Sequence, residues 1–242
     1  MDASSTRVSD LSGRAVLSLG IAALAVTAGC AASSKSTPPA ETSLTRSLLE
    51  SGVGIIAEGC SLVAQIGTGV VLGEPGQVVT VAHTIKGADI ITVIDHTGAE
   101  HVAVVRAFDK DRDLAVLEVA DLRVPALELG AVQLGDGGAL TWGRDEGVEF
   151  LPVKVTRRLL VTIEDIYVDD TIQRNAIEVE AEIQIGDSGG PILSAGGNVI
   201  GIIYANSRQR SGVGFASDTS EIESVLDSES DTTVHNGSCF GP

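Results

Sequence analysis

Short apolar runs separated by turn-forming residues fill the chain between residues 61 and 119. They read SLVAQIG, GVVLG, QVVTVAH, DIITVID, HVAVVRAF and LAVLEV, and Gly, Pro, Asp or Lys divides them. Their short length and their content of β-branched residues favour strands over helices. This half of the chain is therefore predicted to be all-β.

A second set of candidate strands follows a linker at residues 120–132. It reads ALTWG, VEFLPVKVTRRLLV, AIEVEAEI, PILS, NVIGIIYAN and GVGFAS. One helix is predicted in DTSEIESVLD, where Asp218 can cap the first turn and Glu221 stands three residues later. The pattern predicts an all-β fold of two lobes of similar size, closed by a short C-terminal helix.

The N-terminal segment has the layout of a secretion signal. Arg7 and Arg14 precede a mostly apolar stretch at residues 15–28, and small residues lead into Cys30. That stretch is shorter than the ~20 residues that span a bilayer. VTAGC resembles a bacterial lipobox, which predicts a lipoprotein-type signal at residues 1–29 and a lipid on Cys30. Ordinary signal cleavage and an uncleaved anchor are the alternatives. We expect an exported protein, either lipid-anchored on the outer side of the cell membrane or periplasmic or secreted.

Small polar residues and proline follow the predicted signal. Residues 31–47 read AASSKSTPPAETSLTRS, which is typical of a flexible tether. We place the tether at residues 30–52 and one folded domain at residues 53–242. No internal repeat is visible, and we expect no further domain after the predicted helix.

Composition narrows the classes of partner. The chain has 43% hydrophobic but only 3% aromatic residues, so β-branched side chains are expected to fill the core. It carries 33 acidic against 16 basic residues, a formal net charge of −17, and no basic stripe. Such a surface repels phosphate backbones, which argues against a nucleic-acid partner. We expect protein or peptide partners, and the sequence indicates no cofactor or metal.

The stretch IQIGDSGGPIL, residues 183–193, holds the first candidate for chemistry. Ser188 is either a nucleophile or a polar residue in an ordinary turn, because Asp, Ser, Gly and Pro are also common turn residues. Gly186, Asp187 and Ser188 can present successive backbone N–H groups into a concave turn. Such donors stabilise a developing oxyanion.

Nucleophilic catalysis by serine also needs an imidazole base and a carboxylate that orients it. His83 stands where an apolar strand is predicted to end, whereas the other three histidines have polar surroundings. Asp113 directly precedes an apolar strand, while Asp109 and Asp111 look solvated. Taken singly, a structural role is the more frequent one for a strand-end histidine and for an aspartate that starts a strand.

The motifs VAHT, DRDLAVL and GDSGGP occur in this order along the chain. Together they resemble the His, Asp and Ser motifs of the chymotrypsin-like (trypsin-fold) serine proteases. GTGVVLGEPGQVVTVAHTIKGA and AFDKDRDLAVLEV are closer to the bacterial HtrA/Deg-type branch, and Cys60 with the terminal VHNGSC is similar to the MarP-type proteases. The resemblance covers about residues 58–240. It implies two antiparallel six-stranded β-barrels with a short C-terminal helix, without the PDZ domain of full HtrA/Deg proteins.

Carried over by motif, the resemblance implies that Ser188 attacks the scissile carbonyl, His83 acts as general base and Asp113 orients His83. Backbone N–H groups of Gly186 and Ser188 would form the oxyanion hole, with Asp187 shaping that loop. We expect a small or medium apolar side chain in the specificity pocket. The implied substrate-binding residues are Tyr204, Ala205, Asn206, Gly214 and Phe215.

Two further cysteines, Cys60 and Cys239, lie near opposite ends of the mature chain. In an exported protein an even pair predicts a disulfide, and two separate thiols are the alternative. Closing a loop of 179 residues (239 − 60) would stabilise the fold by roughly 5 kcal/mol in the chain-entropy model.

Three functions are compatible with these motifs. An exported serine endopeptidase that forms an acyl-enzyme intermediate is the leading prediction. A catalytically silent module would keep the peptide-binding cleft without turnover. An esterase or acyltransferase fits the G-x-S-x-G form of GDSGG, but the flanking strands and the order His, Asp, Ser disfavour it.

Overall fold

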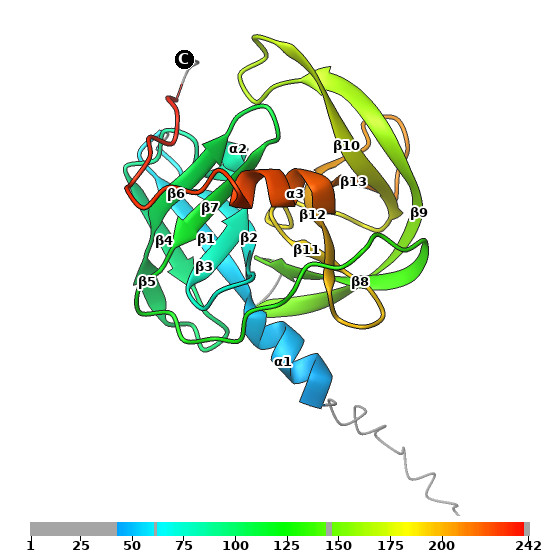
Figure 1. Ribbon diagram of the computed structural model, residues 1–242, viewed down its shortest axis with the longest axis horizontal. Helices are drawn as coiled ribbons and strands as arrows, with labels where there is room; N and C mark the ends of the chain where they lie inside the picture. The colour runs from blue at the N-terminus through cyan, green and yellow to red at the C-terminus, as the bar shows by residue number, and fades with distance from the viewer. Residues whose placement is uncertain (1–42, 61, 144–146, 240–242) are drawn as a thin grey trace, which may run out of the picture. The chain divides into compact units, whose positions relative to one another are not determined.

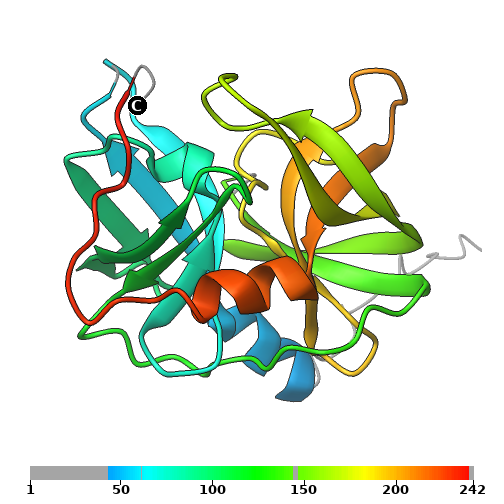
Figure 2. The same ribbon diagram turned by 45° about the horizontal axis from the view of Figure 1, so that its top comes forward.

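The computed structural model describes residues 43–60, 62–143 and 147–239 of the 242-residue chain. The predicted signal, Cys30 and the first part of the predicted tether lie outside the described residues. In the described part, two β-sheets lie side by side, and helix α3 (Thr219–Leu226) runs across the seam between them (Figures 1 and 2). The predicted all-β class is confirmed.

The first sheet has seven strands in the order β5-β4-β1-β2-β3-β7-β6. Six strands were expected, and the difference arises at Ala103, whose N–H donates to Ile91 O at 3.0 Å. This single residue separates β5 from β6, and these two strands stand at opposite ends of the order. The two ends of the sheet therefore meet at Ala103. The strands are β1 (Gly52–Glu58), β2 (Gln65–Val71), β3 (Gln77–Thr80), β4 (Ile90–Ile94), β5 (Glu100–Val102), β6 (Val104–Asp109) and β7 (Leu114–Glu118).

The second sheet is a closed barrel of six strands in the order β10-β13-β12-β11-β8-β9. Strands β9 and β10 form a long hairpin that pairs from Glu164 and Thr171 down to Lys154 and Glu180. The tip of this hairpin reaches the first sheet, where the Ile166 N–H donates to Lys110 O at 3.4 Å. The strands are β8 (Gly135–Trp142), β9 (Val148–Glu164), β10 (Thr171–Glu180), β11 (Pro191–Leu193), β12 (Val199–Asn206) and β13 (Val213–Asp218).

Three buried clusters of apolar side chains form the core. One fills the first sheet and one fills the barrel. The third, the seam cluster, joins Val70 and Leu114 of the first sheet to Leu140 and Ile202 of the barrel and to Ile222 of α3. The buried members of all three clusters are Val, Ile, Leu or Ala, as the aromatic-poor composition predicts.

The predicted C-terminal helix is present, and its cap is as expected, because the Asp218 side chain accepts the Ser220 N–H at 2.9 Å. A second helix, α1 (Ser43–Ser51), occupies residues that we expected in the tether. Leu48 and Leu49 pack against the seam cluster, which orders this segment ahead of β1. Within the described ranges, no helix is both long and apolar enough to cross a membrane.

Candidate active site

His83 lies in the single-turn helix α2 (Ala82–Ile85), which follows β3, an interior strand of the first sheet between β2 and β7. Ala82, Thr84 and Ile85 are buried and anchor this turn to the first sheet. The His83 side chain is 35% exposed. A packed strand therefore ends by presenting an imidazole at the surface.

Asp113 contacts both the ring and the main chain of His83. Its Oδ2 lies 2.8 Å from His83 Nδ1, and its Oδ1 accepts the His83 backbone N–H at 2.9 Å. Asp113 is only 5% exposed, and its φ of 54° lies in the left-handed region that non-glycine residues rarely adopt. One buried carboxylate thus fixes the imidazole and the turn that carries it.

The charges around His83 set its proton affinity. Burial lowers the pKa of His83, but the charge of Asp113 and its hydrogen bond raise it, while the charges of Lys86 and Arg174 lower it. The net shift of the His83 pKa is upward from its ordinary value of 6.5. Asp113 therefore stabilises the imidazolium form, as a general base requires once it has taken a proton.

The loop between β10 and β11 carries Ser188. Asp187 is fully buried and shapes this loop, because its Oδ2 accepts the Gln184 N–H at 2.7 Å and its own N–H donates to Gln184 O at 3.2 Å. Gly186 has a φ of 99°, which glycine adopts without strain. Within the described residues, the N–H groups of Gly186 and Ser188 donate to no backbone acceptor. These two donors are available to a developing oxyanion, whereas the Asp187 N–H is used by the loop.

Thr68 of β2 supports this loop from the first sheet, a contact that the sequence analysis missed. Its Oγ1 donates to Gly186 O at 2.7 Å and accepts the Trp142 N–H at 2.8 Å. Its own N–H donates to Ser188 O at 2.7 Å. The available signal is a single hydroxyl between two glycines in the otherwise apolar run IGTGVV. Both partners of the hydroxyl are distant in sequence, so the pattern alone did not reveal them.

Close approach of β2 explains two glycines near Ser188. Gly189 has a φ of 88°, and a Cβ on it would overlap with Thr68 O. A Cβ on Gly67 would lie 3.0 Å from both Ser188 O and Thr84 Cγ2. Strand β2 therefore runs between the Ser188 loop and the turn that carries His83. Among the hydrogen bonds of the described residues, none joins the His83 ring to Ser188 Oγ; such catalytic contacts are often long without substrate.

A cleft of about 780 Å³ opens beside His83 and Asp113. The end of β9 and the hairpin tip form one wall, and the end of β12 with the loop after it forms another. Gly214 and Ser188 are not among the lining residues. Four of the five predicted substrate-binding residues line this cleft: Tyr204, Ala205, Asn206 and Phe215.

Cys60 and Cys239 form a disulfide with a Cα–Cα distance of 5.3 Å, so the alternative of two separate thiols is wrong. The bond ties the end of β1 to the C-terminal segment. Nearby, the Gly87 N–H donates to Asn236 O at 2.9 Å. In the part of the chain that the structure describes, no group of three His, Cys, Asp or Glu side chains can hold a metal ion.

A two-sheet all-β fold with a His–Asp pair and a GDSGG loop at its seam defines the class of trypsin-like serine proteases. A family model of the trypsin-like peptidase domain matches residues 67–202, which is more than half of the chain. The chain therefore belongs to the trypsin-like peptidase family, and two of the three curated relatives named below are named as serine proteases.

Several curated proteins are similar to this chain. It is 32% identical to the magnetosome formation protease MamE of Magnetospirillum gryphiswaldense, over 64% of this chain and 21% of that protein. It is 29% identical to the serine protease Rv3671c of Mycobacterium tuberculosis, over 71% and 43%. It is 32% identical to a DegP-like periplasmic serine endoprotease of Chlamydia trachomatis, over 66% and 33%. The chain thus spans less than half the length of these relatives.

Solved structures of proteases are also similar to this chain. The active form of the Rv3671c protease of M. tuberculosis superposes with a TM-score of 0.77 at 25% identity, covering 82% of this chain and 89% of that chain. The inactive form of the same protease gives a TM-score of 0.67 at 26% identity, covering 76% and 91%. The expected resemblance to the HtrA/Deg-type and MarP-type proteases is confirmed.

Proposed function

We propose that this chain is an exported serine endopeptidase that hydrolyses peptide bonds of extracytoplasmic proteins through a His83–Asp113–Ser188 triad. The observation that carries the proposal is the double contact of Asp113 with His83, at the ring and at the main chain. This pair lies at the seam that also holds the GDSGG loop, with two backbone N–H groups unused by that loop. The family supplies the reaction class.

In the proposed mechanism, Ser188 Oγ attacks the scissile carbonyl carbon while His83 Nε2 takes the hydroxyl proton. Asp113 stabilises the imidazolium, and the N–H groups of Gly186 and Ser188 hold the oxyanion. The tetrahedral intermediate then collapses, the C–N bond breaks, and His83 protonates the leaving amine. Water repeats the sequence on the acyl-enzyme and releases Ser188.

The cleft supports an extended peptide as the substrate. The end of β12 brings Tyr204, Ala205 and Asn206 into the cleft wall, so a substrate strand can pair with this segment. A Cβ on Gly214 would overlap with the Ile183 side chain, so Ile183 fills the space at that glycine. Because Ile183 occupies this space, we expect the specificity pocket to accept a small or medium apolar side chain of the substrate.

The proposed location is outside the cytoplasm, with a lipid on Cys30 as the anchor. The disulfide supports export, since such bonds form and persist in oxidising compartments. A DegP-like relative is named as periplasmic. Cys30→Ala should release the protein from the membrane fraction, and a Cys30→Ala protein that stays bound would disprove the lipid anchor.

The test of activity is covalent labelling of the purified protein, with its disulfide intact, by a fluorophosphonate probe. The wild type should be labelled at Ser188, and Ser188→Ala should abolish labelling. Ser224→Ala is the matched control, because Ser224 is exposed on α3 and its hydroxyl only donates to Ser220 O. A folded wild type that is not labelled would contradict the proposal and favour a silent peptide-binding module.

A further inference from the structure

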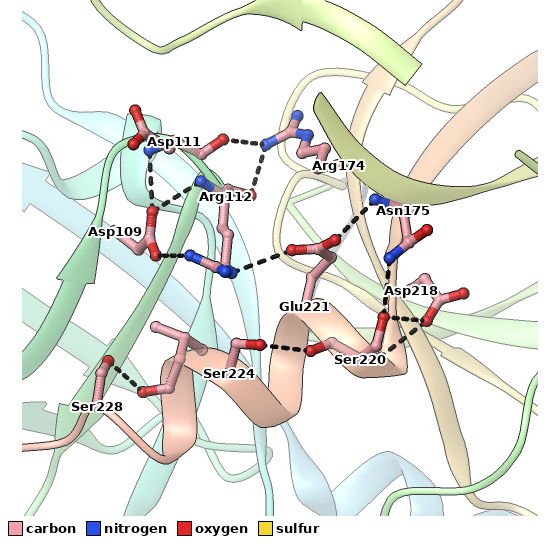
Figure 3. Close-up of polar contacts among 11 residues, drawn as sticks. Asp109, Asp111, Arg112, Arg174, Asn175, Asp218, Ser220, Glu221, Ser224 and Ser228 are labelled. Atoms are coloured by element: carbon pink, nitrogen blue, oxygen red, sulfur yellow. Dashed lines mark hydrogen bonds and ion pairs between the residues drawn. The ribbon is translucent and has the colours of Figure 1, made fainter. Parts of the chain in front are cut away.

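Arg174 of β10 reaches out of the barrel to Asp111 and Arg112 (Figure 3), the two residues directly before Asp113. Its Nη1 donates to Arg112 O at 2.5 Å and lies 3.4 Å from Asp111 O. The residue is only 4% exposed. A buried guanidinium of one sheet therefore holds two successive carbonyl groups of the other, directly before Asp113.

The turn that Arg174 contacts needs outside support. Asp113 has a φ of 54°, a conformation that is disfavoured for a residue with a Cβ. Such a backbone persists where the surrounding structure holds it. The His83 contacts hold the Asp113 side chain, while Arg174 holds the peptide groups in front of it.

The same turn is tied to β10 a second time, through helix α3 (Figure 3). Glu221 Oε1 accepts the Asn175 N–H at 2.7 Å, and its Oε2 lies 3.1 Å from Arg112 Nε. Arg112 Nη1 in turn lies 2.7 Å from Asp109 Oδ2. Asn175 directly follows Arg174, so both sets of contacts start from neighbouring residues of β10. The contact made by Arg174 is the one nearer to Asp113, because it reaches the main chain directly before that residue.

On its other side, Arg174 contacts the cleft. Its guanidinium carbon lies 4.0 Å from the centre of the Tyr204 ring, a cation–π geometry. Arg174, Tyr204, His83 and Asp113 all line the same cleft. The charged groups that act on His83 are Asp113, Lys86 and Arg174, and both cations lower the His83 pKa.

We propose that Arg174 is a positioning residue of the active site, which holds the Asp111–Asp113 turn from the closed barrel and keeps a fixed cation beside the His83–Asp113 pair. This proposal rests on the proposed protease function. A planar guanidinium suits the role, because it can donate in its plane to two carbonyls while its face stacks on Tyr204. A lysine keeps the charge but not this geometry.

The experiment measures the rate of fluorophosphonate labelling of Ser188 between about pH 5 and about pH 9, around the ordinary range of histidine. Four proteins are compared: the wild type, Arg174→Met, Arg174→Lys and the control Arg123→Met. Arg123 is exposed and donates only to nearby carbonyls of its own loop. Thermal unfolding of each protein reports the folded fraction.

We expect Arg174→Met to be labelled about 10- to 100-fold more slowly at the plateau, because the Asp113 turn loses its support. The midpoint of its acidic limb should move to higher pH, because a cation near the imidazole is lost. Arg174→Lys should be slowed as well, with a midpoint near that of the wild type. A residue that only stabilises the fold would change the unfolding temperature and leave this midpoint in place.

The outcomes separate this proposal from the protease function itself. No labelling of the folded wild type defeats the protease function. Normal labelling of the wild type together with an unchanged rate and midpoint in Arg174→Met defeats the role of Arg174. If Arg174→Met does not fold, Arg174→Lys decides: slower labelling at an unchanged midpoint supports the role, and a wild-type rate overturns it.

Discussion

Asp113 Oδ2 lies 2.8 Å from His83 Nδ1 while Oδ1 accepts the His83 backbone N–H at 2.9 Å, so one carboxylate orients the ring and anchors its turn. The two oxygens have separate tasks, and both are nearly removed from water, since Asp113 is 5% exposed. Replacing this carboxylate is therefore the most direct probe of the proposed triad.

Asp113→Asn should lower the rate of fluorophosphonate labelling by about 10⁴-fold with little change in fold. An amide at this position can donate to Nδ1 and so favours the wrong tautomer of His83. The rate is measured under the same conditions as for the wild type, with Asp136→Asn as control, because Asp136 is exposed on β8. A loss of less than about tenfold would count against Asp113 as the orienting acid.

The rate of labelling of the wild type should fall at acidic pH. The midpoint of this fall should lie above pH 6.5. The neutral imidazole is the base, and the pKa of His83 is raised above its ordinary value of 6.5 because Asp113 outweighs the effect of burial. The rate should fall as the pH falls through this raised value. Stability has the opposite sign: the stabilisation from the pair is complete below pH 6.5 and is lost as the pH rises through the folded pKa. A midpoint at or below 6.5 in the labelling profile would contradict this prediction.

Thr68→Val should impair the Ser188 loop, because the valine keeps the volume of the side chain and removes its hydroxyl. The partly buried Trp142 N–H and the buried Gly186 C=O would each lose a partner, at a cost of up to about 1–3 kcal/mol apiece. We expect slower labelling and a lower free energy of unfolding. Thr68→Ser keeps the hydroxyl and is expected to restore most of the rate. Equal rates in Thr68→Val and the wild type would show that the loop does not need this bridge.

Removal of the disulfide should destabilise the fold by up to roughly 5 kcal/mol, since Cys60 and Cys239 close a loop of 179 residues. The comparison is urea unfolding of the wild type against the Cys60→Ser, Cys239→Ser double variant. Adding a reductant should lower the unfolding midpoint of the wild type and leave that of the double variant unchanged. Identical midpoints for the two oxidised proteins would refute the stabilising role.

The local pattern of apolar runs and turn-forming residues predicted much of the fold, because residues close in sequence determine where most of these strands and helix α3 begin and end. Runs of β-branched residues between turn formers correspond to most strands, and the cap at Asp218 correctly marked the start of α3. The pattern did not reveal β1 or α1. Leu48 and Leu49 of helix α1 pack against the seam cluster, and that cluster exists only in the folded chain.

The sequence by itself determined the all-β class and the order of the His83, Asp113 and Ser188 motifs, and it predicted the pairing of Cys60 with Cys239 that the structure confirms. Only the tertiary structure decided that the two ends of the first sheet meet at Ala103 and that Thr68 and Arg174 hold the loops of the candidate site. These contacts join residues 118 and 62 positions apart. Their partners are backbone carbonyls, which every residue carries, so no residue pattern marks them. Packing of the first sheet against the closed barrel selects which carbonyls meet which side chains.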